Sequence, residues 1–142
     1  DWGNEERYEK AIGVGECAGV VIDLIATLLF ESEEKIQNAQ EMFENEKWAT
    51  SIYHAYSSMV NSAKALLTSE NTKVNTHHSI IKDFDEKFVS DGRIAVAGGF
   101  ENLVLQLSKN EPTKEFAASY IKDALVFLEA VERFRQQELA EV

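Results

Sequence analysis

The chain has 142 residues, of which 44% are apolar and 27% are charged, a balance that suits one folded domain with a real core. Its 14 basic and 25 acidic residues give a net charge of −11, which argues against nucleic acid and anionic membranes as partners. The single Pro and the single Cys exclude a collagen-like chain, an internal disulfide and a multi-cysteine metal site.

Residues 1–15 predict a tail or linker from a larger protein, and residues 16–142 predict the folded domain. The chain begins with Asp1 rather than Met, which suggests processing or excision from a longer chain. No basic segment precedes an apolar run, so a signal peptide is not expected. The most apolar run, residues 18–30, is too short for a membrane span and contains Asp23. We therefore expect a cytoplasmic protein that makes no membrane contact.

A first long helix is predicted from about residues 16–18 to Glu46. Its apolar residues recur at helical spacing, and the stripe is widest in the first half, which predicts burial on two sides there. The members of this stripe are Ile22, Ile25, Leu29, Ile36 and Phe43. A break is expected at residues 45–47, although neither Gly nor Pro enforces it.

A central helix is predicted over residues 48–67, continuing to about Ser69. Apolar residues recur along it at steps of three and four, and no Gly or Pro interrupts them. Its opposite side is polar and is predicted to face water, which makes it the first place to look for a site. That side carries His54, Ser57, Ser58, Asn61 and Lys64.

The second half of the chain predicts shorter elements and one more long helix. A polar loop follows the central helix, and a helix is expected over residues 77–89, ended by Gly92 in a left-handed cap conformation. Residues 93–99 are either an irregular connection or the start of a short helix near residues 100–107. Pro112 breaks the chain, and Thr113 is the predicted N-cap of the last helix, which should fray near Gln136. Together, these predicted helices indicate an all-α, up-and-down bundle of about five helices, three long and two short.

Few residues carry a pattern that indicates chemistry. His77 and His78 are adjacent and point apart on a helix, so they make a poor metal-chelating pair, and no metal or other cofactor is expected. Cys17 lies between glycines near a helix start, where it is either a small structural residue or a thiol of lowered pKa. Glu33 and Glu34 are predicted to be solvated. No phosphate-binding loop or nucleophile elbow is present in the sequence.

Two blocks of the sequence resemble the HEPN domain family. Residues 55–67, AYSSMVNSAKALL, are similar to the AYYAMFHAARALL-type helix of that family. Residues 76–89, THHSIIKDFDEKFV, resemble its TH-led short helix, and PTKEFAASYIKDALVFLEAVERF resembles its late capped helix. The resemblance covers about residues 18–138 and implies an up-and-down bundle that is often a dimer.

The resemblance also implies two alternative activities. Some HEPN proteins are metal-independent ribonucleases that use an Arg followed four to six residues later by a His, and no arginine of this sequence is followed by such a His. On that ground the domain is predicted not to be an enzyme. Other HEPN domains are proposed to bind nucleotides or to act as interaction modules. The residues that match the ligand-binding positions are His54, Tyr56, Asn61, Lys64 and His77.

The stretch from Tyr8 to Glu31 resembles the junction at which a HEPN-like domain follows a siroheme-dependent sulfite or nitrite reductase. The leading hypothesis is therefore a non-catalytic module that forms a homodimer or docks on an adjacent domain of a larger redox enzyme. The alternative hypothesis is a nucleotide or small-ligand binding domain. A third hypothesis is a metal-independent ribonuclease.

Overall fold

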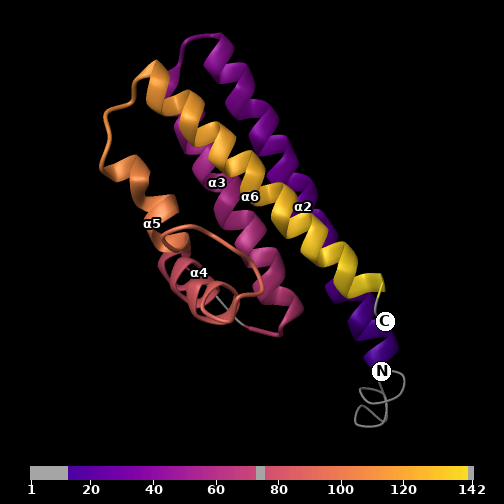
Figure 1. Ribbon diagram of the computed structural model, residues 1–142. Coiled ribbons are helices and arrows are strands. Elements are labelled where there is room, and N and C mark those ends of the chain that lie inside the picture. Colours follow the sequence, from indigo (N-terminus) through magenta and orange to yellow (C-terminus); the bar gives the residue numbers. More distant parts are fainter. Residues whose placement is uncertain (1–12, 73–75, 141–142) are drawn as a thin grey trace.

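The computed structural model describes residues 13–72 and 76–140. Of the tail expected over residues 1–15, residues 1–12 lie outside them, whereas residues 13–15 belong to the first helix. Three long helices lie side by side: α2 (Gly13–Glu44), α3 (Trp48–Ser69) and α6 (Lys114–Ala140) (Figure 1). The short helices α4 (His77–Phe84) and α5 (Phe100–Val104) lie beside this three-helix layer. No strand occurs in the described part of the chain, so the predicted all-α bundle of three long and two short helices is confirmed.

The predicted helix ends agree with the structure at several positions. Gly92 has a φ of +76°, the left-handed conformation that a terminating glycine adopts at little cost. Thr113 caps α6, because its Oγ1 accepts a hydrogen bond from the backbone N of Phe116 at 3.1 Å. The break after α2 needs no glycine, because Glu46 itself takes a φ of +61°. Helix α2 begins at Gly13, ahead of the predicted start near residues 16–18.

The main cluster of the core contains buried residues from α2, α3, α4, α5 and α6, and a smaller cluster of Ile25, Leu28 and Ala65 joins α2 to α3. The centre of the main cluster is a group of phenylalanine rings that joins α4 and α5 to α6, with the Phe84 ring 4.8 Å from that of Phe100 and 5.4 Å from that of Phe127. The hydroxyl of Tyr120 donates to the carbonyl oxygen of Val104 at 2.6 Å, which ties α6 to the end of α5. These contacts hold α4 at a fixed place against the long helices.

The prediction that the polar side of α3 faces water is wrong for its serines. Ser57 and Ser58 are both buried, because α3 is the central helix and packs against α2, α6 and α4. The Ser58 hydroxyl donates to the carbonyl oxygen of Ser32 on α2 at 2.9 Å, and the Ser51 hydroxyl donates to that of Ala39 at 2.8 Å. Since the buried hydroxyls of Ser51 and Ser58 are hydrogen bonded, these small side chains let α2 and α3 approach closely without a desolvation penalty.

Two irregular segments follow α4. The helix continues as a π-helical turn, η2 (Asp85–Val89), and α5 continues as a 3₁₀ turn, η3 (Leu105–Ser108). The carboxylate of Asp85 accepts hydrogen bonds from the backbone N of Phe100 at 2.7 Å and of Glu101 at 2.8 Å. Asp85 thus supplies the N-terminal cap of α5 from a distant part of the chain, and fixes the two short helices relative to each other.

Candidate functional site

The start of α4 places two histidines at one end of the short-helix layer. The hydroxyl of Thr76 accepts a hydrogen bond from the backbone N of Ser79 at 3.1 Å, which caps the helix. His77 and His78 are therefore the first two residues of α4, and both side chains are exposed. The first turn of a helix presents unpaired backbone N–H groups, so a phosphate near His77 would meet a favourable partial charge.

His77 forms a hydrogen bond with a tyrosine on the neighbouring helix. The distance between Tyr56 Oη and His77 Nδ1 is 2.9 Å, and the two ring centroids are 5.5 Å apart. Burial, and then the nearby Tyr53, raise the pKa of Tyr56, so its hydroxyl keeps its proton. Whether that hydroxyl donates to Nδ1 or accepts from it depends on the tautomer of the imidazole. In either case the bond occupies Nδ1 and leaves Nε2 available for another contact.

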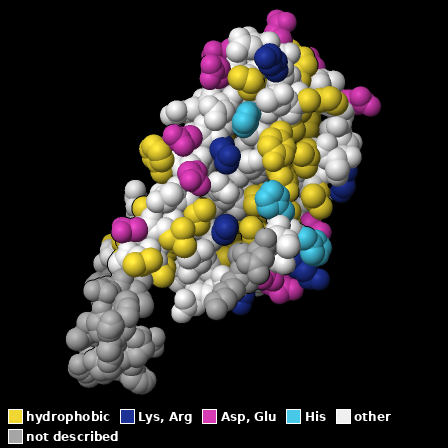
Figure 2. Space-filling view, turned by 180° about the vertical axis from the view of Figure 1, so that it is seen from behind, with side chains coloured by type: hydrophobic (Ala, Val, Ile, Leu, Met, Phe, Trp, Pro, Cys, Tyr) yellow, Lys and Arg dark blue, Asp and Glu magenta, His cyan; other side chains and the backbone are white. Residues whose placement is uncertain are grey.

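Two further aromatic side chains extend this pair along α3. The Tyr53 ring centroid lies 6.1 Å from that of Tyr56 and 6.3 Å from that of His54. Tyr53 is 56% exposed, which is unusual for a large ring beside a core helix. We call Tyr53, His54, Tyr56 and His77 the aromatic strip. Figure 2 shows histidines and a hydrophobic patch on one face of the molecule, with Lys or Arg and Asp or Glu side chains around them.

The five ligand-binding residues predicted from the sequence do not form one compact cluster. Tyr56 and His77 are in contact, and His54 is beside Tyr53, with its Nδ1 buried and without a hydrogen-bond partner in the described residues. Asn61 and Lys64 are half-buried further along α3. Lys64 is eight residues beyond Tyr56, which corresponds to a rise of about 12 Å along the helix. A ligand that reaches both residues must therefore be extended.

Sequence reasoning missed Tyr53 and Glu132. Tyr53 falls outside the helical stripe, and its neighbouring rings, His54 and Tyr56, lie on the same helix. The other omission is Glu132 on α6, which lines the same surface groove as Glu33 of α2. Burial, and then the neighbouring carboxyls of Glu33 and Glu129, raise the pKa of Glu132 to about 7. Glu33 itself is exposed, as predicted.

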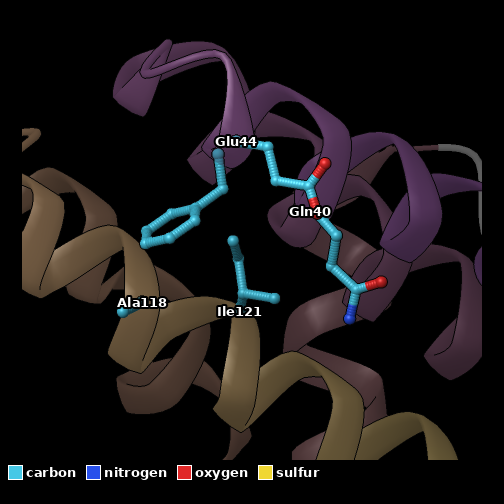
Figure 3. Close-up of a pocket in the computed structure, with 5 residues that line it drawn as sticks. Gln40, Glu44, Ala118 and Ile121 are labelled. Atoms are coloured by element: carbon cyan, nitrogen blue, oxygen red, sulfur yellow. The ribbon is translucent and has the colours of Figure 1, made fainter.

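A surface hollow of about 370 Å³ lies elsewhere, between the end of α2 and the start of α6. In Figure 3, Gln40 and Glu44 extend from α2, while Ala118 and Ile121 face them from α6. None of the residues predicted as ligand-binding lines this hollow. Within residues 13–72 and 76–140, no group of three or more His, Cys, Asp or Glu side chains is arranged to hold a metal ion. No helix in those ranges is long and apolar enough to cross a membrane.

The sequence matches a family model and a named relative. The model described as HEPN domain matches residues 25–134, which include the aromatic strip and most of α6. A protein of Methanocaldococcus jannaschii named "Putative toxin MJ0605" is 31% identical over 116 residues, covering 77% of this chain and 87% of that protein. These matches confirm the resemblance read from the helix motifs.

The same matches overturn the prediction that this domain is not an enzyme. A relative that carries a toxin name, in a family that includes ribonucleases, points to an enzymatic activity. The prediction rested on one absent motif, an Arg followed by a His. The absence of that pair removes one set of catalytic residues and leaves the class of reaction open to other side chains, among which the structure brings Tyr56 and His77 together.

Proposed function

The chain belongs to the HEPN domain family, and we propose on that basis that it is a toxin-type HEPN domain that binds and cleaves single-stranded RNA at the aromatic strip. The observation that carries the proposal is the hydrogen bond of 2.9 Å between Tyr56 Oη and His77 Nδ1 on an exposed surface. A tyrosine that fixes the imidazole in one orientation is the arrangement that proton transfer by a histidine requires.

Cleavage of RNA without a metal needs only proton transfer. The 2′-hydroxyl loses its proton as its oxygen attacks the adjacent phosphorus, and the departing 5′-oxygen gains a proton. Imidazole changes its protonation between pH 5 and 8. In the tautomer whose Nδ1–H donates to Tyr56 Oη, Nε2 of His77 is unprotonated and can accept the proton of the 2′-hydroxyl, and the resulting imidazolium can give a proton to the 5′-oxygen. The N-terminal turn of α4 would stabilise the charge of the phosphate.

The net charge of −11 constrains how such a ligand is held. Few phosphate contacts are available, so binding relies mainly on stacking of bases on the exposed Tyr53 ring and its neighbours. Lys64 is the cation on α3 that is suited to meet a phosphate further along an extended strand. We therefore expect a shallow dependence of affinity on salt, with a slope of about 1 in a double-logarithmic plot.

The direct test uses an unstructured RNA oligonucleotide of about 12 nucleotides, incubated with the chain in excess EDTA. We expect cleavage products that end in a 2′,3′-cyclic phosphate, and no cleavage of the DNA of the same sequence, which lacks the 2′-hydroxyl.

His77→Ala should slow cleavage at least about 100-fold, as expected for loss of an acid or base. His78→Ala is the matched control, since it is equally exposed and has no hydrogen bond to Tyr56, and it should change the rate little. Equal effects of the two substitutions would remove the assigned role of His77, and lack of both cleavage and binding would refute the proposal.

A second candidate property, self-association, is favoured by the exposed apolar side chains of α2. Val20 is 68% exposed, Leu24 46% and Phe30 60%, which is far more than a helix packed in a monomer usually shows. We propose that a second copy of this chain covers them in a homodimer. This property is compatible with RNA cleavage and does not depend on it.

Sedimentation equilibrium on the full chain tests self-association. We expect a dimer at micromolar concentration, and a monomer for Val20→Glu combined with Phe30→Glu. The control is Val126→Glu, because Val126 on α6 is also 57% exposed and lies outside this surface. A wild-type monomer at high concentration, or equal dissociation by the control, would contradict this assignment.

Three further expectations about the parent protein remain proposals. The resemblance to a reductase junction suggests an adjacent redox domain, and part of that stretch lies outside the described residues. The matched regions bear on the helical domain alone. A cytoplasmic location and the lack of a cofactor in this domain likewise stand as proposals.

A further inference from the structure

One nitrogen of His54 is not accounted for by the contacts of the folded chain. Among the side chains that the structure describes, the Nδ1 atom of His54 is the buried polar atom that lacks a hydrogen-bond partner. Buried polar groups are almost always paired, so an unpaired one calls for a physical reason. His54 as a whole is half-buried, so the other edge of its ring, with Nε2, reaches the surface of α3. That edge is therefore available to a ligand.

The burial of Nδ1 selects the tautomer of His54. A neutral imidazole carries its proton on one nitrogen, and its other nitrogen is a bare acceptor. A proton on Nδ1 would leave a buried N–H without an acceptor, which costs more than a buried bare nitrogen. The proton therefore lies on Nε2, and His54 presents an uncharged N–H donor at the surface. His77 differs, because its Nδ1 is bonded to Tyr56.

The register of the helices places His54 at the seam between α3 and α2. His54 lies three residues after Ser51 and four before Ser58, and the hydroxyls of both serines donate to carbonyl oxygens of α2. On α2, Lys35 lies in the same way between the two residues that accept these bonds. Residues spaced by three and four share a helix face, so His54 and Lys35 flank the seam from the two helices.

Lys35 lies on the side of the seam that α6 does not cover. The residues of α2 that share hollows with α6 include Leu29, Glu33 and Gln40. Each of them is at least about 120° around the helix from Lys35, at 3.6 residues per turn. Within residues 13–72 and 76–140 the ammonium of Lys35 forms no ion pair, although Glu31 is one turn earlier on α2. Lys35 is therefore a cation that an anionic ligand can use.

The helix that carries His54 has no acidic residue. The chain has 25 Asp and Glu residues, but none of them is among the 22 residues of α3. The same helix carries Lys64, which is half-buried, and the exposed ring of Tyr53. The charge of −11 is thus located on other parts of the chain, and a phosphate meets less repulsion along α3.

We propose that His54 and Lys35 form a phosphate site for the nucleotide whose base stacks on Tyr53. The Nε2–H group of His54 donates to a non-bridging phosphate oxygen, and the Lys35 ammonium supplies the charge. This inference rests on the proposed binding of single-stranded RNA at the aromatic strip. Successive helical residues are about 100° apart, so His54 and Tyr56 lie on opposite sides of Tyr53. The phosphate held here is therefore a neighbour of the one that is cleaved beside His77.

The first experiment measures binding of a 2′-O-methyl RNA of about 12 nucleotides, which cannot be cleaved, by fluorescence anisotropy on the full chain. His54→Ala should weaken binding about tenfold, the loss expected for one hydrogen bond to a charged group. His54→Gln should stay within about threefold of the wild type, because its amide N–H can replace the Nε2–H group. The matched control is His78→Ala, which removes an exposed imidazole outside the aromatic strip and should leave the affinity unchanged.

Two further comparisons separate a phosphate contact from a base contact. On the same oligonucleotide with neutral methylphosphonate linkages, His54→Ala should weaken binding less than about twofold. Lys35→Gln should lower the salt dependence of affinity by about half, because Lys35 and Lys64 are the two cations that release counterions. His54→Ala should leave that dependence unchanged, since an uncharged donor releases none. Lys122→Gln on α6 is the control for charge, because Lys122 is exposed and lies outside the seam.

A measurement on the wild-type chain needs no substitution at His54. Long-range ¹H–¹⁵N correlation spectra of the chain with ¹⁵N-labelled histidine should show the proton of His54 on Nε2 and a bare Nδ1. The Nε2–H signal should shift when the phosphodiester oligonucleotide is added, and not with the methylphosphonate form. A proton on Nδ1 of His54, or equal loss of affinity on both backbones for His54→Ala, would overturn the phosphate site.

The outcomes also separate this site from the proposed function. If the wild type binds and cleaves RNA while His54→Ala and Lys35→Gln bind it as the wild type does, the phosphate site alone is wrong. If the wild type binds neither the RNA nor its 2′-O-methyl form, the proposed function is wrong and the phosphate site with it.

Discussion

Replacing Tyr53 and Tyr56 together with Ala should weaken binding of single-stranded RNA at least about 30-fold. Stacking of one base on an aromatic ring is worth about 1–3 kcal/mol, and the acidic chain offers little phosphate binding to compensate for its loss. Tyr53 is the more exposed ring, and Tyr56 is half-buried beside it with a centroid distance of 6.1 Å. Fluorescence anisotropy with a labelled 12-nucleotide RNA measures the affinity.

Two other substitutions make this result specific. Phe30→Ala removes an aromatic side chain that is 60% exposed on α2, and it should leave the affinity for RNA unchanged. Tyr56→Phe keeps the ring and deletes the hydroxyl that is bonded to His77 Nδ1. Affinity should then stay close to that of the wild type while the cleavage rate falls, because the imidazole is no longer held. If Phe30→Ala weakens binding as much as the tyrosine pair does, RNA does not bind at the aromatic strip.

The helices could be predicted from the sequence because each carries its own local signals. Apolar spacing identified α2, α3 and α6, while Gly92 and Thr113 marked ends that the structure confirms. The family could also be recognised, because its two signature blocks lie on α3 and α4. Local periodicity and local caps are properties of a short stretch of chain, and they need no knowledge of what packs against it.

The features that were missed depend on contacts between distant segments. The serines of α3 were predicted to face water, yet the hydroxyl of Ser58 is buried and donates to the carbonyl oxygen of Ser32 on α2. Asp85 caps a helix that begins 15 residues later. In each case a polar side chain is satisfied by tertiary structure, which residue type and spacing alone do not reveal.

The residues of the site also divide into those that local motifs predicted and those that depend on contacts between helices. Tyr56 and His77 were both predicted as ligand-binding from the family motifs, and the structure places them in contact. Asn61 and Lys64 share the helix with Tyr56 but lie further along it, and Tyr53 was not predicted at all. The family motifs therefore identified His54, Tyr56 and His77, whereas the contact between Tyr56 and His77 followed only from the packing of α4 against α3.

The aromatic strip depends in turn on the core beneath α4, and Phe84→Ala should show this. Phe84 is fully buried, and its ring stacks on that of Phe88 at 5.0 Å and contacts two further rings from α5 and α6. Truncation of such a residue typically costs about 3–5 kcal/mol, a large part of the 5–15 kcal/mol that stabilises an ordinary domain. We expect the melting temperature to fall by about 10–20 °C.

Urea denaturation of Phe84→Ala, compared with Val126→Ala, measures this cost. Val126 is 57% exposed on α6, so its truncation should change the free energy of unfolding by less than about 0.5 kcal/mol. Phe84→Leu keeps most of the buried volume and should fall between the two. Since the rings around Phe84 anchor the helix that carries His77, RNA cleavage by Phe84→Ala should decline at temperatures where the variant is still folded. A variant with normal stability, or with full activity up to its melting temperature, would show that the position of His77 is set by the contact with Tyr56 alone.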